Sequence, residues 1–406
     1  MPQDPRRIVL YSHDTMGLGH TRRNLLIARA LSEGRTPPAI LMIFGASEAR
    51  SWDMPPGTEG LTLPSVHKGV SGHYASRRMA VPFESVIGIR KRAIEAAIDA
   101  FDPDLMIVDK VPGGLAGELL PALRLLRRRG RARIVLGLRD VLDDAATVRS
   151  EWTREDNYRI VEECYDAVWV YGDPAIVDPV EEYGLGDTIA RKLHFTGYPD
   201  PRLRLSGPAV AGGTEVTGPI SLCLVGGGQD GAPLARAFAG ARYPAGNTGV
   251  LVTGPQMPDA AHHDLVSRFG GRDDLRIVRF DPDADRLIAR ADHVIAMGGY
   301  NTVVEILAHE RRALIVPRVV PRTEQLIRAE RLAGLGLVDL LSPDLATPDA
   351  LSDWLLAGTT PRARAHHTLD FGGLARINLL ARALLVTPKR RRVRTDAGLR
   401  SLGAVG

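Results

Sequence analysis

The sequence predicts an α/β protein with two doubly wound parallel sheets that face each other across a cleft. Short apolar runs rich in β-branched and aromatic residues alternate with helix-forming stretches, as in buried parallel strands joined by helices. This alternation is interrupted once, at 206–218, where Gly, Pro, Ala and Thr dominate, and it then restarts. We therefore expect two similar halves rather than one large sheet.

Hydrophobic periodicity and helix end signals give the individual elements. In the first half, strands are expected at Ile8–Tyr11, Ala39–Phe44, Leu105–Val108, Ile134–Leu138 and Ala167–Val170, with helices near Arg23–Ser32, Glu84–Ala100, Gly117–Arg129 and Glu155–Tyr165. In the second half, strands are expected at Ile220–Leu224, Gly249–Val252, Leu275–Val278, His293–Ala296 and Ala313–Val316, with helices near Pro233–Phe238, Ala261–Phe269, Asp283–Arg290, Thr302–His309 and Thr323–Ala333. The expected division is a Rossmann-like domain at 1–204, a linker at 205–218, a second Rossmann-like domain at 219–370, a C-terminal helix at 371–388 and a disordered basic tail at 389–406.

Composition excludes several classes of protein. The 406 residues are 44% hydrophobic but contain no apolar run of the ~18 residues that a transmembrane span needs, and no signal peptide opens the chain, so a cytoplasmic protein is expected. The net charge of +4 is too balanced to indicate nucleic-acid binding. Much of the excess lies in the tail from Lys389 to Arg394, which indicates a solvated tail or, as the alternative, peripheral contact with an anionic membrane. Cys164 and Cys223 lie in apolar surroundings and are expected to be core thiols.

Four turns that follow predicted strands contain the candidate binding and catalytic residues, because ligands of open α/β sheets bind beyond the carboxyl ends of the strands. The first is Gly17-Leu18-Gly19-His20, where glycines let the backbone approach a ligand and the following helix offers free N–H groups. His20 is the candidate base there, with Arg22 and Arg23 behind it. A structural turn with an N-cap histidine is the alternative.

The second turn could line the binding site of an acceptor substrate. It contains Asp109, Gly113 and Gly114, and the next strand end adds Arg139 and Asp140. An ordinary Pro-Gly turn and a simple ion pair are the alternatives here.

The third turn, at 226–231, holds four glycines in six positions, a nest of amides suited to phosphate oxygens. It lacks the Gly-Lys-Ser/Thr ending of a P-loop and the GxGxxG spacing of a dinucleotide site. Gly227, Gly228 and Gln229 are the candidate phosphate contacts.

The fourth turn has the most specific pattern, with Gly298-Gly299 followed by Asn301, Thr302 and Glu305 at the start of a helix. Glu305 could bind two ribose hydroxyls of a nucleotide whose phosphates lie on that helix N-terminus. The spacing Thr302-x-x-Glu305 also fits a capping box, in which Glu305 only satisfies a backbone N–H. The residues alone leave both readings open.

Taken together, the GxGH turn of the first half and the GGxNTxxE turn of the second resemble the MurG-like glycosyltransferases of family 28, which have the GT-B fold. The sequence segments around the fourth turn also resemble this family: "RFDPDADRLIARADHVI" before it and "ALIVPRVVPRTEQLIRAERLAGLGL" after it. "TGYPDPR" is similar to the family's exit from the first domain but replaces an Asn with Tyr198, which puts a role for Arg202 in question. "GLGHTRR" is also similar to the GxGHxxR turn of nucleotide-sugar hydrolases of the same architecture.

The resemblance implies a role for each matching residue. Glu305 would bind the ribose, the amides of Asn301 and Thr302 would face the diphosphate, and His20 would stand near the reacting carbon. In these implied roles, backbone around Phe280 would contact the base, and Glu324 and Gln325 would bind the sugar hydroxyls. The implied donor contacts are Gly17, Gly19, Gly227, Gly228, Gln229, Phe280, Gly298, Gly299, Asn301, Thr302, Glu305, Glu324 and Gln325.

The expected activity is an inverting, metal-independent transfer of a sugar from a nucleoside-diphosphate sugar, UDP-linked, to a hydroxyl acceptor. No cofactor other than this donor and no metal ligands are expected. A nucleotide-sugar hydrolase and a non-catalytic nucleotide-sugar-binding protein are the alternatives. The sequence leaves the sugar, the acceptor and the oligomeric state open.

Overall fold

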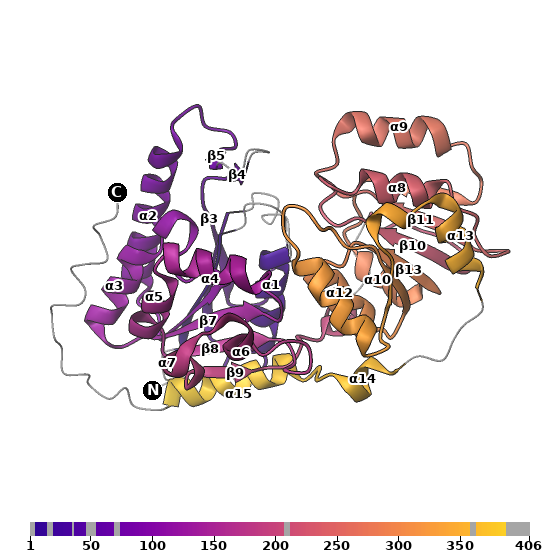
Figure 1. Ribbon diagram of the computed structural model, residues 1–406. Helices are drawn as coiled ribbons and strands as arrows, with labels where there is room; N and C mark the ends of the chain where they lie inside the picture. The colour runs from indigo at the N-terminus through magenta and orange to yellow at the C-terminus, as the bar shows by residue number, and fades with distance from the viewer. Residues whose placement is uncertain are drawn as a thin grey trace.

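The computed structural model describes residues 5–13, 19–34, 36–45, 54–68, 74–206, 212–357 and 363–386, and it has two lobes (Figure 1). The strand order is β3-β2-β1-β6-β7-β8-β9 in the first lobe and β12-β11-β10-β13-β14-β15 in the second. Every neighbouring pair within these two sheets is parallel. The predicted fold class of two doubly wound parallel sheets is confirmed.

The first lobe covers its sheet with helices on the connections between strands. Its strands are β1 (Arg7–Ser12), β2 (Ala39–Phe44), β3 (Thr58–Thr62), β6 (Leu105–Asp109), β7 (Arg133–Arg139), β8 (Ala167–Tyr171) and β9 (Leu193–Phe195), beside a small antiparallel pair, β4 (Val66–Lys68) and β5 (Tyr74–Ser76). Its helices are α1 (Gly19–Ser32), α2 (Phe83–Phe101), α3 (Leu120–Arg129), α4 (Ala145–Arg154), α5 (Asn157–Cys164), α6 (Pro179–Tyr183) and α7 (Gly186–Ala190).

The second lobe repeats the plan. Its strands are β10 (Ile220–Leu224), β11 (Thr248–Val252), β12 (Leu275–Val278), β13 (His293–Ala296), β14 (Arg312–Ile315) and β15 (Asp339–Leu340). Its helices are α8 (Ala232–Ala239), α9 (Asp259–Phe269), α10 (Ala284–Arg290), α11 (Tyr300–Ala308), α12 (Glu324–Gly334), α13 (Pro348–Leu356) and the short α14 (Ala365–Thr368).

Both faces of the second sheet are buried, which is why its strands read as continuous apolar runs. Successive side chains of a strand point to opposite faces. Cys223 and Ile295 accordingly pack with the helix residues Leu234 and Leu351 of α8 and α13. Their strand neighbours, such as Leu222, belong to the core on the side of α10, α11 and α12. Both cysteines are buried free thiols, as predicted, and burial raises the pKa of Cys164 to about 11.

The last described helix, α15 (Gly373–Val386), returns from the second lobe and runs along the first (yellow in Figure 1). Asn378 Nδ2 donates to the carbonyl oxygen of Ala30 in α1 at 2.9 Å. Arg133 Nε, on β7, donates to the carbonyl oxygen of Leu384 at 3.3 Å. The chain therefore crosses between the lobes twice.

Some predicted segments fall outside the described residues. Residues 207–211 of the predicted linker and the predicted basic tail at 389–406 are among these. In the described part of the chain, no helix is both long and apolar enough to span a membrane.

Candidate functional site

The four turns singled out in the sequence follow β1, β6, β10 and β13. In the first sheet β1 and β6 are neighbours, and in the second β10 and β13 are neighbours, so each pair lies where the strand order changes direction. A doubly wound sheet binds its ligand at such a switch point, because the two flanking turns diverge there. Of the first turn, Gly17 lies outside the described residues, while Gly19 and His20 open α1.

His20 is backed by a buried carboxylate. Its side chain is 20% exposed, whereas that of Asp109, the last residue of β6, is fully buried. His20 Nδ1 lies 3.0 Å from Asp109 Oδ2. Arg23 Nη2 also lies 3.1 Å from His20 Nδ1, but Nη2 already donates to both Asp109 oxygens. Because an ionised carboxylate can only accept, we assign the ring proton to Nδ1, which leaves Nε2 as the basic nitrogen. The N-cap reading of His20 is wrong, since α1 already includes Gly19.

Arg23 fixes the charge state of Asp109. Arg23 Nη2 donates to Asp109 Oδ1 at 2.7 Å and to Oδ2 at 2.6 Å. Burial alone would raise the pKa of Asp109, but Arg23 and then His20 outweigh it and hold this pKa well below its usual range. The Arg23 guanidinium also lies over the Tyr300 ring, 5.1 Å from its centre. Asp109 is therefore an anion at neutral pH that orients the imidazole.

The fourth turn forms an uncapped helix N-terminus. α11 begins at Tyr300, and its N-cap, Gly299, has no side chain with which to bind the first amides. Asn301 and Thr302 are then the second and third residues of the helix, with first-turn N–H groups that suit an anion. Glu305 lies beyond that turn, so the capping-box reading is wrong.

Glu305 instead pairs with the first lobe. It is buried, and Arg22 Nη2 lies 3.4 Å from its Oε1. Next to this pair, Asn301 Nδ2 donates to the Gly19 carbonyl oxygen at 2.8 Å. A Cβ on Gly19 would lie 2.9 Å from Asn301 Nδ2, so the contact requires a residue without a side chain at this position. The starts of α1 and α11 are therefore in direct contact between the two lobes.

The third turn and Phe280 are partly accessible. Gly227 and Gln229 are exposed, whereas Gly228 is buried against the following loop, where a Cβ would stand 2.3 Å from the Thr253 carbonyl oxygen. Phe280, which follows β12, is 49% exposed. Contacts of these residues with phosphate or base stay predictions.

Glu324 and Gln325 open α12, and Glu324 contacts the first lobe. Arg139 Nη2 donates to Glu324 Oε2 at 2.8 Å, and Arg318 Nη2 lies 3.5 Å from Glu324 Oε1. Burial opposes ionisation of Glu324, but Arg139 and then Lys110 outweigh it and lower its pKa to about 2. Gln325 Oε1 accepts the backbone N–H of Arg318 at 3.0 Å. The predicted ion pair between Arg139 and its neighbour Asp140 is replaced by two pairs between the lobes.

Asp140 makes the second of these pairs and is buried. Arg328 Nη2 donates to Asp140 Oδ1 at 2.8 Å, and Tyr198 Oη donates to Oδ2 at 2.9 Å. Gly113 and Gly114 are also buried, in a turn that packs against Leu119. These three acceptor-side candidates are therefore inaccessible in this structure, because Arg328 and the packing of the turn cover them. Arg139, at 11% side-chain exposure, is the most accessible of that group.

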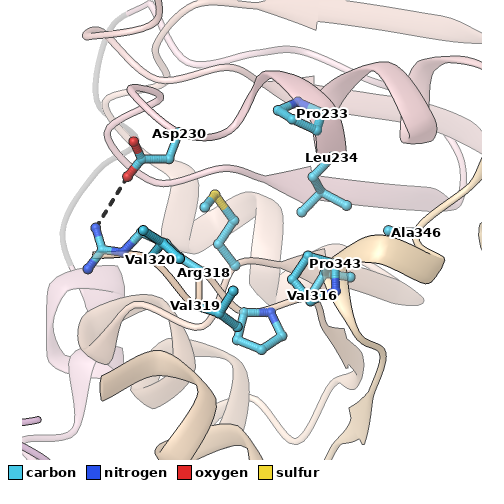
Figure 2. Close-up of a pocket in the computed structure, with 11 residues that line it drawn as sticks. Asp230, Pro233, Leu234, Val316, Arg318, Val319, Val320, Pro343 and Ala346 are labelled. Carbon is cyan, nitrogen blue, oxygen red and sulfur yellow. Dashed lines mark hydrogen bonds and ion pairs between the residues drawn. The ribbon is translucent and has the colours of Figure 1, made fainter. Parts of the chain in front are cut away.

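An apolar cavity of about 230 Å³ lies at the same end of the second sheet (Figure 2). Met297, just before Gly298, lines it, and the pair of Arg318 Nη1 and Asp230 Oδ2, 3.4 Å apart, stands beside it. The remaining lining residues are Pro233, Leu234, Val316, Pro317, Val319, Val320, Pro343 and Ala346. Over the described part of the chain, no group of three or more His, Cys, Asp or Glu side chains is placed to hold a metal ion.

Sequence reasoning missed the residues that join the lobes. Tyr300 Oη donates to the carbonyl oxygen of Tyr171 at 2.7 Å, and Arg328 and Arg322 reach Asp140 and Asp143 of the first lobe. These partners are 129 or more positions apart, so no local pattern pairs them. Lys110 stood inside the second turn but was not selected, although a basic residue beside Asp109 was a usable signal.

The chain is similar to known proteins in part of its sequence and in its fold. Residues 222–368 match the model of the glycosyltransferase family 28 C-terminal domain. Among curated proteins, no sequence matches the chain. The expected resemblance to MurG-like glycosyltransferases is confirmed by the domain match and by the fold.

Three solved structures illustrate the likeness of fold. The calicheamicin glycosyltransferase CalG4 superposes with a TM-score of 0.61 at 19% identity, over 94% of this chain and 100% of that one. MurG of Acinetobacter baumannii gives 0.51 at 15% identity, over 93% and 95%. The UDP-GlcNAc 2-epimerase of Neisseria meningitidis, bound to UDP-GlcNAc, gives 0.57 at 9% identity, over 94% and 99%.

Proposed function

We propose that this protein transfers a sugar from a UDP-linked donor to a hydroxyl acceptor, with inversion and without a metal ion. The match of residues 222–368 to the glycosyltransferase family 28 C-terminal domain supports glycosyl transfer. The observation that carries this proposal is the pairing of two helix starts across the cleft. One of them presents His20 backed by Asp109, and the other is the uncapped start of α11. A base and an anion site thus face the same space.

The donor lies on the second lobe in this proposal. The first-turn amides of α11 receive the diphosphate, since a helix N-terminus carries partial positive charge. Glu305 binds the ribose hydroxyls, and its partner Arg22, 3.4 Å away, adds positive charge beside the diphosphate. Glu324 and Gln325 hold the sugar from the start of α12.

Transfer then takes place in one displacement. The acceptor oxygen gives its proton to His20 Nε2 as it forms a bond to the anomeric carbon. The bond from that carbon to the diphosphate oxygen breaks, and UDP leaves with the electron pair. Attack from the face opposite the leaving group inverts the configuration. The amides of α11 and Arg22 stabilise the negative charge that develops on UDP, which is the role a metal ion would otherwise have.

The test begins with thermal shifts against nucleoside diphosphates and nucleotide sugars, because only a true ligand of the native state raises the melting temperature. The nucleotide sugar with the largest shift is then incubated with a panel of hydroxyl acceptors, with and without EDTA, and the anomeric configuration of the product is read by NMR. We expect an inverted glycoside whose yield is unchanged by EDTA.

Other outcomes separate the alternatives. Rapid release of free sugar in water alone would make the protein a nucleotide-sugar hydrolase. A thermal shift without turnover on any acceptor or in water would make it a binding protein. A retained configuration or full loss of product with EDTA would contradict the proposed chemistry.

A further inference from the structure

Around Glu324, the three positive side chains of Lys110, Arg139 and Arg318 outnumber the negative ones, because Asp230 is the second acid of the group and pairs with Arg318. Lys110 directly follows β6, and Arg139 ends the neighbouring strand β7. Lys110 N–H donates to the Gly137 carbonyl oxygen at 2.8 Å, which fixes the two side chains at adjacent strand ends. Arg318 approaches the same carboxylate from the second lobe. We name these three cations together with Glu324 the Lys110 cluster.

The negative charge nearby is already engaged. Glu324 is contacted by Arg139 at 2.8 Å and by Arg318 at 3.5 Å. Asp109, next to Lys110 in sequence, gives both of its oxygens to Arg23 and His20. Among the residues that the structure describes, none forms a hydrogen bond or ion pair with the Lys110 ammonium.

Arg139 also has an unused donor. Its Nε is buried and, within the described ranges, has no hydrogen-bond partner. A buried donor left without an acceptor is destabilising, so an additional acceptor beside Arg139 is favoured. Two donors on adjacent strand ends, Lys110 Nζ and Arg139 Nε, therefore lack an acceptor.

We propose that Lys110, with Arg139, binds a carboxylate carried either by the transferred sugar or by the acceptor. The inference rests on the proposed function, because it places this carboxylate between His20, near the reacting carbon, and Glu324, which holds the sugar. One uncompensated ammonium matches a single negative charge. Arg139, whose guanidinium already binds Glu324, adds hydrogen-bond geometry to this charge.

The experiment compares ligands that differ only in this carboxylate. Calorimetry measures the affinities of UDP, UDP-glucose and UDP-glucuronate, which has a carboxylate where UDP-glucose has a hydroxymethyl group. With the protein saturated in UDP, it then measures 4-hydroxybenzoate and its methyl ester. For whichever pair contains the true source, we expect the carboxylate form to bind about 10- to 100-fold more tightly, as a charge-assisted hydrogen bond provides.

Variants assign the preference to Lys110. Lys110→Gln replaces the ammonium with a neutral amide on a side chain one atom shorter. Both residues are unbranched at Cβ, so the substitution removes the charge without adding strain at a residue whose φ is +71°. We expect it to abolish the preference for the carboxylate and to leave UDP affinity unchanged. Lys110→Arg should retain most of the preference. Lys91→Gln, on α2, is the matched control and should bind all ligands as the wild type does.

A pH series on the unmodified protein gives a second readout. Burial and then Arg139 lower the pKa of Lys110 to about 8. The other charged groups that face Lys110 are Glu324, Arg322 and Asp109, which do not titrate between pH 7 and 9. His13 also faces Lys110, but burial holds its pKa well below the usual range, so it stays neutral over this interval. The preference for the carboxylate should therefore fall as pH rises through about 8, while the affinity for UDP-glucose stays constant.

The outcomes separate the two sources and the two proposals. A preference for UDP-glucuronate that Lys110→Gln removes assigns the carboxylate to the donor sugar, and the same result for 4-hydroxybenzoate assigns it to the acceptor. UDP binding with no preference in either pair, or with one that survives Lys110→Gln, overturns the inference and leaves the proposed function standing. Failure of UDP itself to bind overturns both.

Discussion

At the scale of single residues, the difference in side-chain exposure gives Asp109 and His20 different proposed roles. Asp109 is fully buried and held as an anion by Arg23, so it cannot meet an acceptor. His20 retains 20% exposure and presents Nε2, which no described residue binds. In the proposed mechanism, His20 would therefore take the proton of the acceptor, and Asp109 would stabilise the resulting imidazolium.

The first prediction follows from that division. A positioned general base contributes about 10²–10⁴-fold to proton transfer, so His20→Ala should lower kcat by this factor. Donor affinity should change little, because His20 is not among the proposed contacts of the donor. Steady-state kinetics with saturating donor and acceptor, together with calorimetry for UDP, check both statements. His263→Ala removes an exposed histidine from α9 and serves as the control. Full kcat in His20→Ala would show that another group is the base.

Glu305 carries the second prediction. With the capping box ruled out, its buried carboxylate has Arg22 as a partner and the ribose as its proposed ligand. Glu305→Ala should weaken UDP binding by about 1.5–3 kcal/mol, the range for a hydrogen bond to a charged group. Glu310→Gln, an exposed acid just after the same helix, should leave UDP affinity unchanged. If calorimetry finds equal UDP affinity for Glu305→Ala and the wild type, Glu305 only joins the lobes.

At the scale of elements, strands in which apolar residues dominate could be predicted, and strands rich in polar residues or glycine could not. β2, β10, β12 and β13 have the predicted bounds because apolar residues make up most of each one. β3 was missed, since Thr58–Thr62 contains Glu59 and Gly60 at the edge of the sheet and is not apolar. α4 was missed although Asp144 caps it, accepting the Thr147 N–H at 2.9 Å, and this N-cap signal was readable.

The candidate site was predictable to the same extent. Strand-end turns predicted His20, Asp109 and Glu305, because doubly wound sheets bring such turns together. Glu324 was predicted only from the resemblance to the family. Which partners they acquire was not predictable. Asp140 and Arg328 are 188 positions apart, and only the docking of the two lobes brings them within 2.8 Å. Pairing between the lobes depends on tertiary geometry that no local pattern contains.

The third prediction concerns this contact between the β7–α4 connection and α12. The Arg328 and Asp140 side chains are each 1% exposed, so removal of either leaves a buried charge unpaired. Asp140→Ala should lower the free energy of unfolding by about 3–5 kcal/mol, and the double variant with Arg328→Met should recover part of this loss.

Urea denaturation measures both variants. Glu155→Gln, which breaks an exposed pair with Arg154, should change stability by less than about 0.5 kcal/mol. A loss below about 1 kcal/mol for Asp140→Ala would mean that water solvates the freed Arg328, and the contact would not hold the lobes together.

At the scale of the whole molecule, the first lobe contains segments from both ends of the described chain, which the sequence alone does not reveal. α15 is the last described helix, yet it packs on α1 of the first lobe (Figure 1). Its start is fixed by Gly373 N–H, which donates to the Tyr198 carbonyl oxygen at 3.1 Å. A Cβ on Gly373 would lie 2.5 Å from that same oxygen, so the close approach requires glycine. The first lobe is therefore completed only when the end of the chain has folded back.

The final prediction uses two truncations that differ by this helix. Removal of residues 373–406 deletes α15 and exposes the first lobe where Leu374, Ile377 and Ala381 are buried. At about 1.5–3 kcal/mol for each large apolar side chain, Leu374 and Ile377 together contribute about 3–6 kcal/mol. That is a large share of the ~5–15 kcal/mol that stabilises a typical domain.

Removal of residues 389–406 alone deletes charge with few apolar residues and should leave the melting temperature and turnover on a soluble acceptor unchanged. Calorimetric unfolding of both truncations beside the full chain checks this. The longer truncation should lower the melting temperature of the first lobe, and UDP should still shift the transition of the second. Equal melting temperatures for the two truncations would mean that the first lobe folds without α15.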